Sequence, residues 1–283
     1  MLWFDHVTSF VKDRHATASG LRDQGLHATE GGLHTGFGSA NDLSYFGLFY
    51  LELLEITDPA EAASSGSEVC RYAVDFLQQG EGLATLALET DDLVTDVRRL
   101  RAAGYTVPEP IAMQRVHDDG FVSHSTIAYP ASDTLAIRPP ILIERSTKPD
   151  KRKDQLADRE IIAPHPAGDI EVNYVAVAVP NAWLAARALA SAYGITSDET
   201  LTPIPELGGE FCTVHLPRAD LQFVQPVGPG AALEQLDRRG SGPFAIGVAL
   251  SDVRHAHWAA REKGDVVDVA GISFVIQKIE VPA

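Results

Sequence analysis

Residues 31–47 read GGLHTGFGSANDLSYFG, and residues 50–54 read YLELL. The first stretch opens with four glycines, the residue type that most often marks a sharp turn, at Gly31, Gly32, Gly36 and Gly38. After them the hydrophobic pattern takes a period close to two, as in a β-strand. We therefore expect one strand over about 39–45, a second over 48–56, and a tight turn before them.

The same kind of arrangement recurs four times along the chain. A strand-like run opens each repeat, at Trp3–Val11, Leu83–Leu88, Val172–Val179 and Phe244–Leu250. Each run leads to a residue that suits a helix N-cap, and each following helix is expected to end at a glycine. The pairs are Asp13 with Gly25, Asp92 with Gly104, Asn181 with Gly194, and Asp252 with Gly264, separated by 12, 12, 13 and 12 positions. Chance would rarely keep that interval, so we expect four copies of one unit.

Three strand-like runs follow the helix in a complete repeat, which makes the repeat a βαβββ unit. In the first repeat a run over 26–29 precedes the two strands given above, and in the second the runs are 105–113, 125–129 and 135–144. The third ends in a hairpin of 211–216 and 221–227, and the fourth keeps only 266–269 and 272–279. The predicted fold class is therefore α+β, with mixed sheets built from repeated βαβββ modules.

The length of 283 residues suits about two domains. Between the second and third repeats the chain carries the charged run KPDKRKD at 148–154 and a Pro-His-Pro sequence at 164–166. In an acidic protein such a run is expected as a solvated connection and not as a nucleic-acid patch. We therefore expect a first module pair over 1–147, a linker over 148–169, and a second, shortened module pair over 170–283.

Acidic residues outnumber basic residues by 39 to 23, and the formal net charge is −16. This balance argues against a nucleic-acid-binding protein and against the basic face of a peripheral membrane protein. The first residues lack the pattern of a secretory leader, so we expect a cytoplasmic protein. Cys70 and Cys212 are too few for a disulfide framework, and we expect them as buried thiols.

These residues and repeats resemble the vicinal oxygen chelate superfamily and, within it, the glyoxalase-like domain family. The resemblance is sharpest over 31–47 and 50–53, and the first strand, with Asp5-His6-Val7, fits the same pattern. The repeats extend the resemblance over nearly the whole chain, although the third and fourth repeats match more in architecture than in residues.

The resemblance implies modules whose sheets curl around a cavity, with ligands for a divalent metal on the first and fourth strands of a module. Members of the superfamily catalyse isomerisation, ring cleavage by dioxygen or thiol transfer to epoxides, and others bind toxic drugs without a metal. The fold alone does not choose among these activities.

By this resemblance His6 on the first strand and Glu52 on the fourth strand take metal-ligand positions. In the second repeat, alignment of the strand end 88–91 with 10–13 places Ala84 where a second histidine is expected. Alignment of 141–144 with 49–52 places Glu144 where a second carboxylate is expected. The expected ligands are therefore His6, Glu52 and Glu144, for a divalent ion such as Zn, Fe, Mn or Ni. Loss of an imidazole lowers the affinity for the later transition metals, so whether a metal binds stays open.

Further residues are expected at the cavity. His34 and Asn41 could serve the site, His34 sharing with Glu144 the task of moving a proton, or they could simply pin the glycine-rich turn. Tyr50 shares a strand face with Glu52 and is expected to contact the ligand. Arg138 could bind an anionic substrate or pair with a surface carboxylate.

The third repeat carries weaker signals. Tyr174 occupies the position of His6 there, and Gln222 or Gln225 replaces the carboxylate, so we expect no second metal site. Two other enzyme classes are poorly supported: the glycine-rich run lacks the Lys-Ser/Thr of a P-loop, and no Gly-x-Ser-x-Gly sequence occurs.

The leading hypothesis is a metal-dependent enzyme of the lyase, isomerase or dioxygenase type that acts on a small oxygenated molecule. The metal would act as a Lewis acid on two neighbouring substrate oxygens. The alternative is a metal-free protein of the same fold that binds or sequesters a small molecule, and the missing histidine at Ala84 is its main support. The substrate stays open, and so does the choice between pairing of the two halves and a homodimer.

Overall fold

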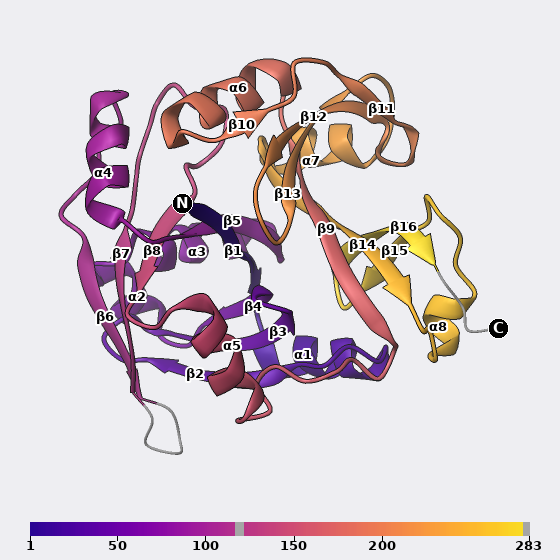
Figure 1. Cartoon of the computed structure of the whole chain (residues 1–283), viewed down its shortest axis with the longest axis horizontal. Helices are drawn as coiled ribbons and strands as arrows, with labels where there is room; N and C mark the ends of the chain where they lie inside the picture. Colours follow the sequence, from indigo (N-terminus) through magenta and orange to yellow (C-terminus); the bar gives the residue numbers. More distant parts are fainter. Residues whose placement is uncertain (117–121, 280–283) are drawn as a thin grey trace. The chain divides into compact units, whose positions relative to one another are not determined.

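The computed structural model describes residues 1–116 and 122–279 (Figure 1). The first repeat is a complete βαβββ unit, with β1 (Leu2–Val11), α1 (Arg14–Asp23), β2 (Thr29–His34), β3 (Ser39–Phe46) and β4 (Phe49–Ile56). Its strands β1, β3 and β4 begin and end within one residue of the prediction, whereas the strand expected over 26–29 only begins at Thr29. The helices α2 (Pro59–Ser64) and α3 (Glu68–Phe76) and the turn η1 (Leu77–Gln79), which no sequence pattern predicted, then lead to the second repeat.

The second repeat contains β5 (Gly82–Thr90), α4 (Leu93–Ala102), β6 (Ile111–Val116), β7 (Val122–Ala128) and β8 (Ile141–Arg145). The strands expected over 105–113 and 135–144 begin later than predicted. Each expected run contains two prolines, Pro108 with Pro110 and Pro139 with Pro140, and proline offers no N–H to a strand ladder. The helix α5 (Pro149–Ala157) follows, inside the segment that was expected as a linker.

The third and fourth repeats complete the chain. Their elements are β9 (Asp169–Ala178), α6 (Ala182–Tyr193), β10 (Thr196–Ser197), β11 (Thr202–Ile204), η2 (Pro205–Leu207), β12 (Gly209–His215), β13 (Asp220–Pro226), α7 (Ala231–Arg239), β14 (Gly242–Ser251), α8 (Ala256–Ala259), β15 (Val266–Val269) and β16 (Ile272–Ile279). The helix cap predicted at Asp252 is wrong. Asp252 has a φ of 50°, and α8 begins after His255, whose side chain accepts the cap hydrogen bond.

The strands form two mixed sheets. One has the order β2-β3-β4-β1-β5-β8-β7-β6, and the other has the order β10-β12-β13-β9-β14-β16-β15 with β11 paired to β12. The first strand of every repeat pairs in parallel with the last strand of the same repeat, which requires the crossover that the helix supplies. The hairpin strands pair antiparallel. The predicted α+β fold of repeated βαβββ modules is thus confirmed.

The chain folds into two compact units, each assembled from three separate segments. The first compact unit comprises Met1–Asp5, Thr85–Lys148 and Tyr174–Phe244. The second compact unit comprises His6–Ala84, Pro149–Asn173 and Ala245–Ala283. Each unit therefore combines two repeats that are not the pairs expected from the sequence, and the domain boundaries at 147 and 170 stay a prediction.

The helices of the three complete repeats begin with the same pair of hydrogen bonds. The N-cap side chain accepts from a backbone N–H of the first turn: Asp13 from Ala16, Asp92 from Thr95, and Asn181 from Leu184. The next-to-last residue of the fourth strand accepts from the first helical N–H: Glu55 from Arg14 at 3.4 Å, Glu144 from Leu93 at 3.1 Å, and Gln225 from Ala182 at 3.0 Å. Both bonds satisfy donors that a helix start leaves unpaired.

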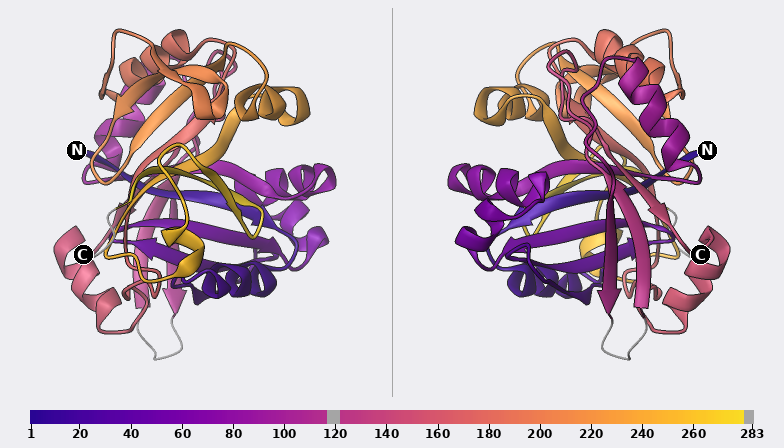
Figure 2. Two further views of the ribbon diagram at one scale, coloured as in Figure 1. Left: turned by 90° about the vertical axis from the view of Figure 1, so that its right-hand side faces the viewer. Right: turned by 90° about the vertical axis from the view of Figure 1, so that its left-hand side faces the viewer.

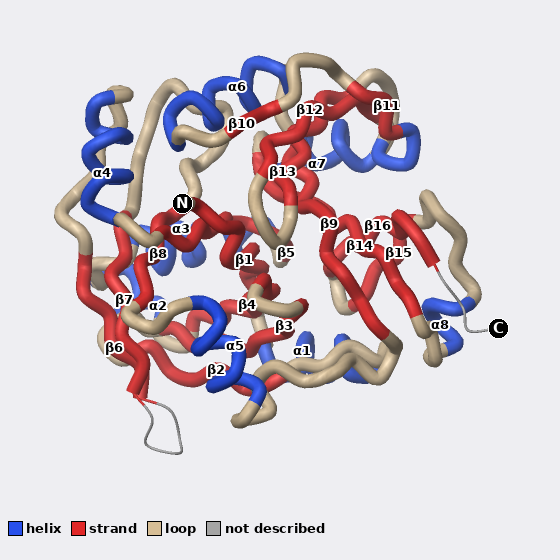
Figure 3. The backbone as a smooth tube through the Cα atoms, viewed as in Figure 1, coloured by secondary structure: helices blue, strands red, loops and turns tan. Residues whose placement is uncertain are grey.

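The helices α1, α4 and α6 each pack on strands of their own repeat. In the second compact unit α1 lies along β3 and β4 (Figure 2), and in the first compact unit α6 lies across the hairpin of β12 and β13 (Figure 3). The opposite face of β1 and β4 carries an apolar cluster of Phe10, Leu54, Ala73, Phe76 and Ala84. That face, away from α1, is where the candidate site lies.

Among the helices of residues 1–116 and 122–279, none combines the length and the apolar character that crossing a membrane requires.

Candidate functional site

His6 and Glu52 lie side by side in the second compact unit. β1 and β4 pair in parallel with Thr8 opposite Glu52, and side chains alternate along a strand, so His6, Thr8 and Glu52 project from one face. His6 Nε2 lies 3.5 Å from Glu52 Oε2, and the two side chains are only 6% and 12% exposed. The predicted pairing of these two residues is therefore present in the structure.

Hydrogen bonds hold the carboxylate of Glu52. Thr8 Oγ1 donates to Oε2 at 2.9 Å, and Asn41 Nδ2 donates to Oε1 at 2.5 Å. Burial opposes ionisation of Glu52, but the imidazoles of His6 and His34 and these two hydrogen bonds outweigh it. The pKa of Glu52 therefore lies below its usual value, and the side chain is an anion at neutral pH.

Asn41 reaches Glu52 because Gly31 leaves room for it. A Cβ atom at position 31 would stand 2.1 Å from Asn41 Oδ1. Asn41 is 4% exposed, and its Oδ1 atom accepts no hydrogen bond within the part of the chain that the structure describes. The structure thus brings Asn41 into contact with Glu52, and its predicted contact with a ligand stays a prediction.

Two apolar clusters enclose the pair of His6 and Glu52 along the same sheet face. Phe10 and Leu54, with the cluster around them, lie toward one end. At the other end Tyr50 stacks on the His6 ring with 4.5 Å between centroids, and Tyr45 lies 4.7 Å from Tyr50. Leu156, near the end of α5, and Ile161 and Ile162, which follow this helix, pack on these tyrosines. The surroundings are thus of low polarity, which strengthens the electrostatic interaction of the pair.

His34 ends β2 at the tip of the hairpin with β3. Its Nδ1 atom lies 2.9 Å from Ser39 Oγ, and Ser39 Oγ lies 3.4 Å from the buried Cys70 Sγ. His34 also contributes to the low pKa of Glu52. The structure therefore places His34 at the hairpin turn, in contact with Ser39, and its proton-transfer function stays a prediction.

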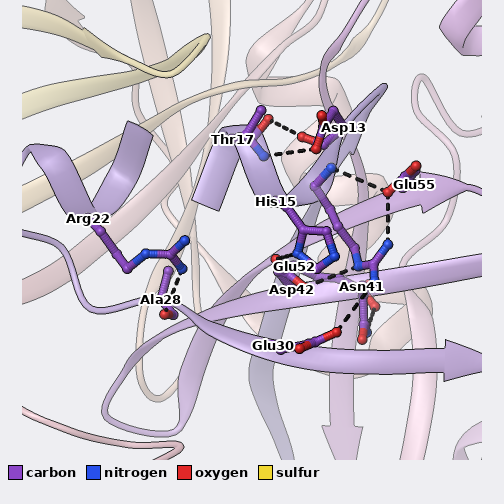
Figure 4. A network of polar contacts seen from close by, with 12 residues as sticks. Asp13, His15, Thr17, Arg22, Ala28, Glu30, Asn41, Asp42, Glu52 and Glu55 are labelled. Carbon is purple, nitrogen blue, oxygen red and sulfur yellow. Dashed lines mark hydrogen bonds and ion pairs between the residues drawn. The ribbon is translucent and has the colours of Figure 1, made fainter. Parts of the chain in front are cut away.

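The face of these strands toward α1 carries a separate network of charges. Arg14 makes ion pairs with Asp42 at 3.2 Å and with Glu55 at 2.9 Å, and Glu30 lies 3.6 Å away. Figure 4 shows Glu30, Asp42 and Glu55 gathered near the start of α1, and also shows Asn41 next to Glu52. Because Asp42 and Asn41 are neighbours in a strand, they serve opposite faces.

The alignment that gave Glu144 its predicted function needs a correction. His6 lies seven positions before the N-cap Asp13, and the residue seven positions before the N-cap Asp92 is Thr85, not Ala84. Ala84 is a core residue of the second compact unit. The observed strand register then makes Ile141, opposite Ala87, the counterpart of Glu52.

Glu144 is instead the counterpart of Glu55. It lies opposite Thr90 and accepts the first N–H of α4 from Leu93, as Glu55 accepts the first N–H of α1. The alignment of Glu144 with Glu52 is displaced by three residues from this register, and the alignment of Ala84 with His6 is displaced by one residue. An odd displacement turns a side chain to the other face of the sheet. The metal-ligand and catalytic functions of Glu144 were inferred from its alignment with Glu52, and the observed register does not support that alignment.

Arg138 is exposed in the segment that precedes β8, in the first compact unit. Its predicted contact with an anionic substrate stays a prediction.

Thr8 contacts Glu52, and the sequence assigned no function to Thr8. Its position on the same face as His6 nevertheless follows from the alternation of side chains along a strand.

The donors present fit a metal centre only in part. Adjacent ligands of a tetrahedral ion with bonds near 2.1 Å stand about 3.4 Å apart, close to the 3.5 Å between His6 Nε2 and Glu52 Oε2. A metal centre of the expected kind needs a third protein ligand, and among the described residues no three His, Cys, Asp or Glu side chains gather in a way that could hold an ion. The described residues therefore do not make up the three-ligand centre, and no chemical step below passes through a metal.

Comparisons with known proteins agree on the fold. The family model described as "Glyoxalase-like domain" matches residues 4–193. A hypothetical protein from Staphylococcus aureus has a similar structure, with a TM-score of 0.74 at 16% identity over 98% of this chain and 100% of that chain. A mutant of 4-hydroxymandelate synthase from Streptomyces coelicolor has a TM-score of 0.55 at 16% identity over 88% of this chain and 71% of that chain.

A xylose isomerase-like TIM barrel/4-hydroxyphenylpyruvate dioxygenase fusion protein has a TM-score of 0.50 at 14% identity, over 88% of this chain and 37% of that chain. No curated protein sequence matches the chain. At such identities the structural similarity supports the fold and not an activity. The family model, however, covers most of the chain, including β1, β4 and the pair of His6 and Glu52. The chain therefore belongs to the glyoxalase-like domain family of the vicinal oxygen chelate superfamily.

Proposed function

We propose that the chain is an enzyme that moves a proton on a small oxygenated molecule, with His6 as the proton-transferring group and Glu52 as the carboxylate that positions it. The observation that carries the proposal is the 3.5 Å separation of His6 Nε2 and Glu52 Oε2 in an almost buried setting. A carboxylate beside an imidazole fixes the orientation and tautomer of the ring and stabilises its protonated form.

The contacts around Glu52 support a positioning function for this residue. Its two oxygens already accept hydrogen bonds from Asn41 and Thr8, so the carboxylate is held in one orientation. Its low pKa makes it a weak proton acceptor by itself, which suits a residue that orients the neighbouring imidazole and does not take the proton. Tyr50, stacked on His6, fixes the plane of the ring.

A second candidate function is the metal-dependent reaction that the sequence suggested. The same 3.5 Å separation favours it, because His6 and Glu52 could act as adjacent ligands. A metal there would polarise substrate oxygens. This candidate requires at least one further ligand beyond the groups that the described residues bring together.

Deuterium exchange tests the first candidate without knowledge of the product. The protein is incubated in D₂O with hydroxyacetone and other small hydroxycarbonyl compounds, and ¹H NMR follows loss of the C–H signals next to the carbonyl. His6→Asn and Glu52→Gln should each lower the exchange rate by about 10²–10⁴-fold, the range that positioned acid–base groups contribute. The matched control is Glu144→Gln, which keeps an acceptor for the Leu93 N–H and should leave the rate unchanged.

Metal content separates the candidates. Elemental analysis of protein purified without chelator, beside His6→Ala, should find no stoichiometric metal, and EDTA should not change the exchange rate. Stoichiometric metal that is lost in His6→Ala, with EDTA-sensitive exchange, would favour the second candidate. Binding of the hydroxycarbonyl compounds with no exchange at all would favour the metal-free binding protein, and a large loss in Glu144→Gln would restore the function first predicted for Glu144.

A further inference from the structure

Residues 149–163, which we call the α5 segment, cover two tyrosines in the second compact unit. Three apolar residues of this segment pack on the cluster that Tyr45 and Tyr50 form with Leu43; they are Leu156, Ile161 and Ile162. The two tyrosines are only 7% and 8% exposed. Tyr50 in turn stacks on the His6 ring. The α5 segment is therefore the outer cover of the aromatic rings that lie beside His6.

Few side chains of the α5 segment are buried. Within α5 only Arg152 is buried, and Leu156, Ile161 and Ile162 are half-buried. A segment with few buried contacts opens at a lower free-energy cost than the core of a sheet. The α5 segment can therefore open while the strands that carry His6 and Glu52 stay folded.

His27 attaches the α5 segment to β3. His27 Nε2 donates to the Glu160 carbonyl at 3.1 Å, and the His27 N–H donates to His165 Nδ1 at 2.8 Å. The carbonyl of His27 accepts from Ser44 Oγ at 2.7 Å, and Ser44 is a fully buried residue of β3. His27 thus connects the turn after α5 to a strand in the core of the sheet.

The turn after α5 is strained. Glu160 has a φ of 55°, in the left-handed region that favours glycine. The Glu160 N–H donates to the Ala157 carbonyl at 2.9 Å and the Ile161 N–H donates to the Leu156 carbonyl at 3.0 Å, a helix end in which glycine is the usual residue. Such strain persists where the surroundings impose it, as the contacts with His27 do here. Opening would release the strain, which lowers the free-energy cost of opening.

The chain beyond this turn is firmly held. Ala167 is fully buried, its N–H donates to the Gly25 carbonyl at 2.8 Å, and its carbonyl accepts from the Arg254 N–H at 2.9 Å. The α5 segment thus precedes a fixed point at Ala167 and is itself held by weaker contacts. This is the arrangement of a lid.

We propose that the α5 segment is a lid over the site of His6 and Glu52, held closed by His27, and that it opens to admit the small molecule. The inference rests on the proposed function, because it assigns a gate to that same site. In the closed state Tyr45 and Tyr50 are covered and water is kept from the buried pair, which strengthens the electrostatic interaction of the pair. In the open state Tyr50 loses its cover and can leave the His6 ring, which gives the small molecule a path to His6.

Diethyl pyrocarbonate, which modifies accessible neutral imidazoles, measures this opening without any turnover. Peptide mass spectrometry follows the modification of His6 at a low extent of reaction. His27→Phe keeps a ring and removes the hydrogen bond to the Glu160 carbonyl, so the modification rate of His6 should rise about fivefold, the change in the opening equilibrium expected for one hydrogen bond. His215 is the internal reference, because it lies in the first compact unit with a side chain 49% exposed and should react at an unchanged rate.

Brief trypsin digestion reports on the α5 segment itself. Trypsin cuts after Lys and Arg, and the segment offers Lys151, Arg152, Lys153 and Arg159. Cleavage follows the open population when closing is fast, so cleavage within 149–163 should rise in His27→Phe by the same factor as the modification of His6. A second variant, Ile161→Ala with Ile162→Ala, keeps His27 and should raise both rates about tenfold through lost apolar contact. Thermal melting checks that the variants stay folded.

His15→Phe is the matched control, because it removes a histidine contact with Asp42 of β3 on the opposite face of the strand. Faster modification of His6 and faster cleavage of the α5 segment in His27→Phe, but not in His15→Phe, support the lid. Unchanged modification of His6, even where cleavage increases, or an equal rise in His15→Phe would overturn it. A lid that passes these tests while hydroxyacetone shows no deuterium exchange would stand, and only the proposed reaction would be refuted.

Discussion

At the scale of single residues, Gly31 determines where the Asn41 side chain lies and therefore how Glu52 is held. A Cβ at position 31 would stand 2.1 Å from Asn41 Oδ1 and 2.5 Å from the Asn41 carbonyl oxygen, so Gly31→Ala should shift β2 locally and push the amide away from Glu52. The carboxylate then loses a hydrogen bond that favours its charged form, and its pKa should rise. Titration of the ¹³C-labelled Glu52 carboxyl by NMR measures this change.

Gly36→Ala is the control for that prediction. Gly36 has a φ of 82°, but a Cβ there would meet no atom within 4 Å, so the variant introduces strain in the same hairpin without moving Asn41. An unchanged Glu52 pKa in Gly31→Ala, or an equal rise in both variants, would contradict the proposed contact.

His165 makes the folded state sensitive to acid. Its Nδ1 atom accepts from the His27 N–H at 2.8 Å, and burial together with the nearby His27 lowers the pKa of His165 from 6.5 to about 4. Between pH 6.5 and 4 the unfolded chain therefore binds a proton at this residue that the folded chain does not bind. The free energy of unfolding should fall by about 3 kcal/mol as the pH drops through this window.

Denaturant unfolding at several pH values tests the contribution of His165. His165→Asn keeps an acceptor for the His27 N–H and cannot titrate, so the fall in stability over this window should become smaller. His215→Gln is the control, because the hydrogen bond that His215 donates to Asp198 raises the pKa of His215. Its loss should change the pH dependence above pH 6.5, in the opposite direction, and should leave the fall between pH 6.5 and 4 in place. An unchanged pH profile in His165→Asn would contradict the prediction.

The sequence places His6 and Glu52 on one strand face, as the structure has them, whereas its alignment of Glu144 with Glu52 does not hold. Strand geometry explains both outcomes. Alternation along β1 and β4 puts His6 and Glu52 on one face whatever else the fold does. In the second repeat the alignment is displaced by one residue at Ala84 and by three residues at Glu144, and an odd displacement exchanges the two faces of a sheet. The N-caps Asp13 and Asp92 give the correct alignment, since the hydrogen bonds of the helix start are the same in both repeats.

At the scale of elements, Arg14 attaches α1 to its strands by ion pairs with Asp42 and Glu55. Asp42 is almost fully buried, so Arg14→Met should leave a buried carboxylate with too few partners and lower the free energy of unfolding by about 3–5 kcal/mol. His15 also contacts Asp42, but its side chain is 57% exposed, and His15→Ala should cost much less. Urea unfolding measures both variants.

The double variant Arg14→Met with Asp42→Asn separates the ion pair from the packing of α1. Removal of the unpaired Asp42 charge should recover part of the free energy of unfolding lost in Arg14→Met, because an amide is less costly to bury than an unpaired carboxylate. If Arg14→Met costs no more than His15→Ala, α1 is held by its apolar contacts alone.

The helices α2, α3 and α5 could not be predicted from the repeat, because they belong to the connections between repeats. α5 in particular lies in a strongly charged segment, whose composition is typical of a solvated linker. Its function in the fold depends on tertiary contacts: Leu156, at its end, and Ile161 and Ile162 after it pack on Tyr45 and Tyr50. No local pattern encodes such a contact.

At the scale of the whole molecule, the contacts that complete the first repeat come from distant parts of the sequence. Residues 1–147 contain His6, Glu52 and their strands but lack the segments Pro149–Asn173 and Ala245–Ala283 of the same compact unit. Without them Tyr45 and Tyr50 lose the cover of Leu156, Ile161 and Ile162, Trp258 no longer donates to the Gln24 carbonyl, and Gly25 loses its backbone bond from Ala167.

We therefore expect a fragment of residues 1–147 to lack a stable fold. Each large apolar side chain left uncovered forfeits about 1.5–3 kcal/mol, and a few such losses equal the 5–15 kcal/mol that keep an ordinary domain folded. Two-dimensional NMR of the fragment should show poorly dispersed amide signals, and addition of a second fragment, residues 148–283, should restore dispersion. A fragment of residues 1–147 that unfolds cooperatively by itself would instead establish the domain boundaries that the sequence suggested, because the first two repeats would then contain every contact that they need.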